Sequence, residues 1–137
     1  MDFDLPDFDT RTGANRGFEL QLIDPKTNAP TQRFIMVCGV DSDAYEAAQL
    51  EQRRRWIKTR ANRRNVNPSP EELDHESMLI LAACTKGWRG FKDRAGAEVP
   101  FSREAAVELY RKYDSIREQV DAAIADRANF LQDSGTS

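Results

Sequence analysis

From about residue 42 onward, glycine and proline occur in a pattern that divides the chain into runs of helical length. Neither residue occurs between about 42 and 64, or between 71 and 86. The segment NVNPSP separates the two runs, and a proline disfavours the helical conformation of the residue before it and lacks an amide hydrogen. We therefore expect one helix over about 42–64 and a second helix over 70–86.

Capping residues support the second of these helices. Ser69 offers a hydroxyl cap, Pro70 occupies the first helical position, and the side chain of Glu72 can reach back to the cap. Gly87 follows the run, where a left-handed residue would end the helix.

Two further helices are expected after residue 102. Ser102 is a good cap for a helix over 103–112, whose apolar residues share one side. Ser115 and Glu118 repeat the capping-box spacing, so the chain is expected to restart there with a last helix over 115–131.

The first third of the chain has the pattern of strands. FELQLID alternates apolar and polar residues with a period of two, and RFIMVCGV is an apolar run rich in β-branched residues. The intervening DPKTNAPTQ holds turn-forming residues, so we expect a β-hairpin over 17–39. A hairpin alone is marginally stable in water, so it must pack on the helices.

These elements predict an α+β fold, mainly α, with an N-terminal hairpin followed by three to four helices. The chain has 137 residues, which suits one domain, expected over 17–131. Residues 1–16 are acidic and show no helical stripe, so they are expected to be flexible, as is the polar tail 132–137. An apolar run of about twenty residues is absent, which argues against a membrane span.

Few residues suit catalysis or metal binding. His75 is the single histidine, and it lies nine residues before Cys84. At about 100° per residue the two would lie on opposite faces of one helix, so they cannot form a catalytic pair there. Cys38 and Cys84 lack the paired spacing of a zinc site, and they are expected to be buried thiols, with a disulfide as the alternative. We expect no enzyme activity, no metal and no cofactor.

A basic block in the first long helix supports a second class of function. It carries seven positive charges in twelve residues and no acid: Arg53, Arg54, Arg55, Lys58, Arg60, Arg63 and Arg64. Such a run could contact phosphates, with Trp56 stacking on a base. However, the isoelectric point of about 5.2 is far from that of a typical nucleic-acid-binding domain. A nucleic-acid-binding adaptor is therefore kept as an alternative to a protein-binding role.

The second half of the chain resembles a known family of phage proteins. The likeness covers about residues 73–131 and rests on a tryptophan-glycine element, a charged turn, a Pro-Phe-Ser helix start and an Arg-Ala-x-Phe-like end. The matching positions are Trp88, Gly90, Asp93, Gly96, Pro100, Phe101, Ser102, Gln119, Arg127, Asn129 and Phe130. In these features the chain resembles the tail assembly chaperones of long-tailed bacteriophages. It departs from their pattern at Asp114 and Ser115, where the family often has a large residue.

The resemblance implies a non-catalytic role in the cytoplasm of the infected bacterium. Such chaperones bind the long, helical tape measure protein, keep it soluble and help tail-tube subunits assemble around it, and they are typically absent from the finished virion. The tape measure protein and the major tail tube protein are thus the expected partners, together with self-association. A structural tail or connector protein is the remaining alternative.

The stretch GWRGFKDRAGAEVPFS, residues 87–102, carries most of the resemblance. Asp93 and Gly96 suit the ends of a type I turn, and the aromatic residues around them could pack on the flanking helices. Candidate contacts with the client, meaning the bound tape measure protein, are Trp88, Phe91, Phe101, Tyr110 and Phe130. For each of them, a place in the hydrophobic core is the alternative.

Overall fold

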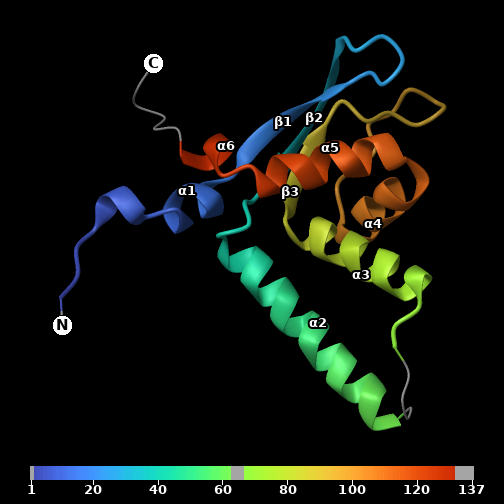
Figure 1. Cartoon of the computed structure of the whole chain (residues 1–137). Helices are drawn as coiled ribbons and strands as arrows, with labels where there is room; N and C mark the ends of the chain where they lie inside the picture. The colour runs from blue at the N-terminus through green and yellow to red at the C-terminus, as the bar shows by residue number, and fades with distance from the viewer. Residues whose placement is uncertain (1, 63–66, 132–137) are drawn as a thin grey trace.

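The computed structural model describes residues 2–62 and 67–131, and it has the expected α+β fold (Figure 1). Its elements, in chain order, are η1 (Pro6–Phe8), α1 (Arg11–Arg16), β1 (Phe18–Ile23), β2 (Pro30–Val37), α2 (Asp43–Asn62), α3 (Pro70–Ala83), β3 (Thr85–Arg89), α4 (Arg103–Lys112), α5 (Asp114–Ala125) and α6 (Ala128–Leu131).

The expected hairpin forms, and a third strand extends it. β1 and β2 pair antiparallel, and β3 pairs antiparallel with the other edge of β2, where Trp88 lies opposite Ile35. The predicted helix over 70–86 therefore ends early, at Ala83, and Gly87 lies in a strand rather than in a left-handed cap. Pairing explains the difference, because β3 satisfies backbone groups along β2 that would otherwise lack partners.

The remaining helices follow the expected boundaries closely. Ser69 caps α3 by accepting a hydrogen bond from the amide of Glu72, and Ser102 caps α4 in the same way. The predicted end of the first long helix, residues 63–64, lies outside the described residues.

The last predicted helix differs in two respects. The chain does restart after α4, but α5 begins at Asp114, and the capping box predicted at Ser115 does not form. Instead, the Ser115 hydroxyl oxygen accepts a hydrogen bond from the side-chain amide of Gln119. The helix over 115–131 is also divided, because α5 ends at Ala125 and α6 covers only Ala128–Leu131.

The hydrophobic core lies between the sheet and the helices α3, α4 and α5. α5 packs against β1 and β2, while α3 packs against both α4 and α5 (Figure 1). The largest fully buried side chains of the core include Tyr110, Ile35 and Ile124. Both cysteines are buried, as expected, and both are free thiols.

The N-terminal segment is more structured than expected. Residues 11–16 form α1, which packs on α6 and buries Ala14, so the prediction of a flexible segment over all of 1–16 is wrong for this part. The carboxylate of Asp9 accepts hydrogen bonds from the amides of Arg11 and Thr12. These local hydrogen bonds favour a helix at α1, although its sequence lacks an apolar stripe.

Gly13 provides a test of how α1 is held. A β-carbon at this position would lie 1.8 Å from the carbonyl oxygen of Phe130, so Gly13→Ala should separate α1 from α6. We expect the free energy of unfolding to fall by about 1–3 kcal/mol. If α1 were free, the same change would stabilise the helix by up to about 1 kcal/mol, because alanine favours helix over glycine. Urea unfolding distinguishes the two signs, with Gly87→Ala as control because nothing lies within 4 Å of a β-carbon there.

Candidate functional site

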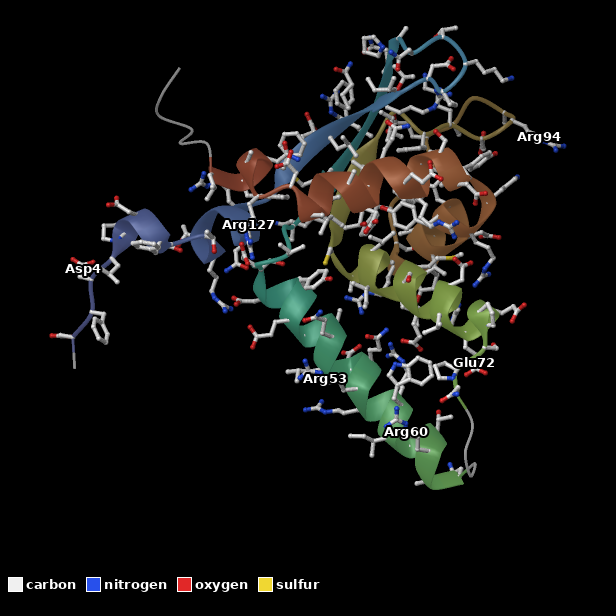
Figure 2. All side chains as sticks on the ribbon, viewed as in Figure 1. Asp4, Arg53, Arg60, Glu72, Arg94 and Arg127 are labelled. Atoms are coloured by element: carbon white, nitrogen blue, oxygen red, sulfur yellow. The ribbon has the colours of Figure 1, made fainter. Side chains whose placement is uncertain are left out.

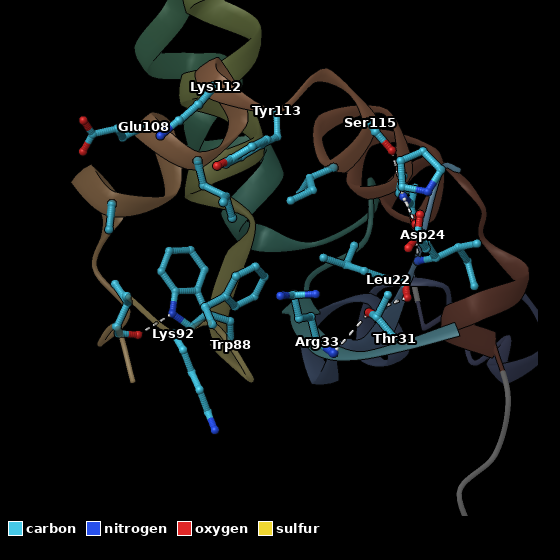
Figure 3. A pocket seen from close by; sticks show the side chains of 18 of the residues that line it. Leu22, Asp24, Thr31, Arg33, Trp88, Lys92, Glu108, Lys112, Tyr113 and Ser115 are labelled. Carbon is cyan, nitrogen blue, oxygen red and sulfur yellow. Dashed lines mark hydrogen bonds between the residues drawn. The ribbon is translucent and has the colours of Figure 1, made fainter. Parts of the chain in front are cut away.

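An open groove of about 660 Å³ lies between the β1–β2 loop, the segment after β3 and the junction of α4 with α5 (Figure 3). Its apolar lining includes Leu22, Trp88, Val99, Leu109, Tyr113 and Ile116. Four cations also line it, namely Lys26, Arg33, Lys92 and Lys112, against two acids, Asp24 and Glu108. The groove therefore combines an apolar floor with a rim that is mostly positive.

The segment after β3 builds one wall of this groove. The indole N–H of Trp88 donates to the carbonyl of Val99 at 2.9 Å, and its ring meets Phe101 edge-on with centroids 5.1 Å apart. The turn predicted at Asp93 and Gly96 is present, because the amide of Gly96 donates to the carbonyl of Asp93 at 3.0 Å. Gly96 has φ +84°, a value that favours glycine. This turn lets the chain return and pack its aromatic side chains on Trp88.

The five predicted client contacts divide into two groups. Trp88 and Phe101 are half-buried and lie together beside the groove. Phe91, Tyr110 and Phe130 are buried in the core, with at most 9% of each exposed. Phe91 nevertheless lines the groove, so it stays a predicted contact. Tyr110 and Phe130 are not part of the groove lining and their surfaces are used in core packing, so these two predicted contacts are corrected to core residues.

The structure also separates the residues of the predicted basic block. Arg53, Arg54, Lys58 and Arg60 are exposed on α2, whereas Arg63 and Arg64 lie outside the described residues. Arg55 lies toward α3, where its guanidinium donates twice from Nε to the carboxylate of Glu76, at 3.0 and 3.2 Å. Hydrogen bonding to Glu76 raises the pKa of Arg55 above its usual value. Arg55 thus joins α2 to α3 and is not available for a phosphate.

The histidine and the two cysteines, which the sequence offered as candidates for catalysis or metal binding, lie in surroundings that do not suit these roles. His75 is exposed, and its Nδ1 lies 3.3 Å from a guanidinium nitrogen of Arg111. Burial raises the pKa of the Cys84 thiol to about 12 and also raises the pKa of Cys38, so neither forms a thiolate readily near neutral pH. Across residues 2–62 and 67–131, no three His, Cys, Asp or Glu side chains gather as metal ligands would.

Sequence reasoning did not foresee what several residues of the resemblance do. The side chain of Gln119 accepts from the amide of Ile23 at 2.8 Å and donates to its carbonyl at 3.0 Å, which ties α5 to the hairpin. Arg127 binds the carboxylate of Asp41 through two nitrogens, at 2.6 and 2.9 Å, and so holds the chain before α6 to the start of α2. Asn129 donates to the carbonyl of Ala123. In the sequence, the one indication of such a contact was a glutamine on an otherwise apolar face of the last predicted helix.

Comparison with known proteins places these features in a family. A search of the curated proteins and a search of the solved structures gave no match. Within the described part of the chain, no helix is long and apolar enough to cross a membrane. The family model described as YdaY prophage protein matches residues 40–136, a range that begins just before α2 and includes most of the residues that line the groove. Because this match covers well over half of the sequence, the chain belongs to the YdaY prophage protein family.

Proposed function

We propose that this prophage protein is a tail assembly chaperone that holds an apolar helical stripe of a tape measure protein in its groove. It would act without catalysis in the host cytoplasm, keep its client soluble until tail-tube subunits assemble around it, and be absent from the finished particle. The phage origin of the family and the resemblance over residues 73–131 both support this role.

The observation that carries the proposal is the apolar floor of the groove. Trp88, Val99 and Leu109 are half-buried and line a space that is open to solvent, and Tyr113 is 47% exposed at its edge. Open apolar surface of this kind marks binding sites, and an amphipathic helix in a groove is a recurring mode of recognition. The client needs such cover, because long apolar helical stripes aggregate when they remain exposed.

The rim of the groove adds a preference for charge. Four cations, Lys26, Arg33, Lys92 and Lys112, outnumber the two acids of the lining. Figure 3 labels Arg33, Lys92 and Lys112 together with Asp24 and Glu108. Charge complementarity increases association rates and specificity. The preferred client segment is therefore an apolar stripe flanked by Asp or Glu.

Co-expression with a tape measure fragment tests the proposal. The chaperone should raise the soluble yield of the fragment and elute with it in gel filtration. Tyr113→Glu places a charge at the edge of the groove and should weaken the complex about tenfold, which corresponds to about 1.4 kcal/mol. Leu131→Glu is the matched control, because Leu131 is 55% exposed on α6 and is not part of the groove lining. Melting curves of both variants show whether the fold is intact.

Two outcomes would contradict different parts of this proposal. If the wild-type chain neither raises the yield nor forms a complex, the chaperone role is wrong. If Leu131→Glu weakens the complex as much as Tyr113→Glu does, the chaperone role stands but the groove is not the binding site. Presence of the protein in purified particles would instead favour a structural tail component.

A further inference from the structure

The outward face of α2 carries an apolar stripe without a partner among the described residues. Only the opposite face of the helix packs on α3, so much of α2 extends away from the rest of the domain (Figure 1). At about 100° per residue, four exposed side chains fall on one line, which we call the outer stripe: Ala47, Leu50, Ile57 and Ala61. Ile57 is 69% exposed and Leu50 is 42% exposed, so both present apolar surface to solvent.

Cations flank this stripe on both sides. Arg53 and Arg60 project on one side of it and Lys58 on the other, whereas Arg54 lies within the stripe, between Leu50 and Ile57. Figure 2 shows Arg53 and Arg60 on the extended part of the helix. No ion pair links any of these four side chains to another described residue. The face thus fits a segment that alternates apolar residues with acids.

The N-terminal arm, residues 2–9, is such a segment. Its sequence DFDLPDFD alternates four aspartates with apolar residues, and Phe3, Leu5 and Phe8 are 77%, 59% and 78% exposed. The arm projects away from the domain at the N-terminal side of α1 (Figure 1). Three large exposed apolar side chains in eight residues indicate a surface that a partner covers.

We propose that the arm of one copy of this protein binds the outer stripe of a second copy. Phe3, Leu5 and Phe8 would cover Leu50 and Ile57, while the aspartates between them face the four cations. With its short η1 turn kept, the arm spans about 13 Å from Phe3 to Phe8, which suits the roughly 10 Å between Leu50 and Ile57 along the helix. This inference stands independently of the proposed function.

The direction of the arm favours a second copy over the same copy. Thr10 lies beside Asp41 and Ser42 at the start of α2, and Arg11 is paired with Asp43 and Glu46. From that anchor the arm runs away from α2 and not along it (Figure 1). In this conformation the arm therefore leaves its own stripe uncovered, and the arm of a second copy can cover it.

The contact joins two different surfaces, so it can pair two copies reciprocally or continue from copy to copy. Light scattering coupled to gel filtration, over a range of concentrations and salt, measures this association. The full-length protein should associate at low salt and dissociate as salt rises, because the contact includes exposed charges.

Charge exchange provides the sharpest test. An arm variant carries Asp2→Lys, Asp4→Lys and Asp7→Lys, and leaves Asp9 to hold α1. A stripe variant carries Arg53→Glu, Arg54→Glu and Lys58→Glu. Each alone should associate at least about tenfold more weakly than wild type, and mixing the two should restore association between them. The control carries Arg94→Glu, Arg103→Glu and Arg111→Glu, the same change of charge at exposed positions outside both the stripe and the groove, and should behave as wild type.

A synthetic peptide of residues 1–10 gives a second readout, because it should compete with the arm and dissociate the full-length assembly. Three results would overturn the inference. The first is a wild-type chain that remains monomeric at every concentration, which includes the case of an arm folded on its own α2. The second is a mixture of arm and stripe variants that fails to associate. The third is a stripe that binds duplex DNA at low salt while self-association is absent.

Discussion

Replacing Tyr110 with alanine is expected to lower the free energy of unfolding by about 3–5 kcal/mol, the range for removing a large aromatic side chain from a packed core. Tyr110 is completely buried on α4, and its hydroxyl lies 2.7 Å from the hydroxyl oxygen of Thr85. The Thr85 hydroxyl donates to the carbonyl of Leu81, so its oxygen accepts from Tyr110. Tyr110 thus joins α4 to the end of α3 and the start of β3.

Two further variants separate packing from hydrogen bonding at this site. Tyr110→Phe keeps the ring and loses one buried hydrogen bond, so it should cost about 1–2 kcal/mol. Tyr113→Ala, three residues later and 47% exposed, should cost less than about 0.5 kcal/mol. Urea unfolding followed by circular dichroism measures all three. If Tyr110→Ala were as mild as Tyr113→Ala, Tyr110 would not be the core residue that the structure describes.

Alkaline pH is expected to destabilise the protein strongly. Burial raises the pKa of Cys84 from 9.0 to about 12 and that of Tyr110 from 10.0 to about 12. Because the folded state holds both groups neutral, their contribution is complete below the unfolded pKa values. It is lost as the pH rises from about 9 toward 12. At about pH 11 the combined loss is on the order of 2–4 kcal/mol.

Unfolding in urea at a series of pH values checks this expectation, and Cys84→Ala provides the control. The variant lacks the thiol, so its stability should fall less steeply above about pH 9 than that of the wild type. Equal slopes for the two proteins would show that the Cys84 thiol is not held neutral by the fold. The same burial predicts slow alkylation of both cysteines in the native state and rapid alkylation in urea.

Elements with strong local signals were predictable from sequence. Ser69 with Pro70 and Glu72 starts α3 where expected, and Ser102 starts α4 at the predicted residue. The alternating FELQLID strand and the turn at Asp93 were equally clear. The caps and the turn join residues within about four positions of each other, and the strand shows a local alternation of apolar and polar residues, so the order of residues contains the information.

The candidate site was only partly predictable. Trp88, a client contact predicted from sequence, lines the groove, but Leu22 and Ile116, on elements far apart in sequence, line it as well. Nothing in the sequence alone brings the hairpin loop to the junction of α4 and α5. Gln119 does so, through two hydrogen bonds to Ile23, a residue 96 positions away.

The sequence by itself determined where the main helices start and that the first two strands form a hairpin. It also determined the composition of the arm and of α2. Only the tertiary structure decided that Thr85–Arg89 form a strand, because the free edge of β2 supplies its partner. It also decided that Tyr110 is core while Tyr113 is surface, and that Arg55 pairs with Glu76 while Arg53 and Arg54 face outward. These distinctions depend on contacts between distant segments, and a burial pattern on one helix does not reveal which neighbour covers it.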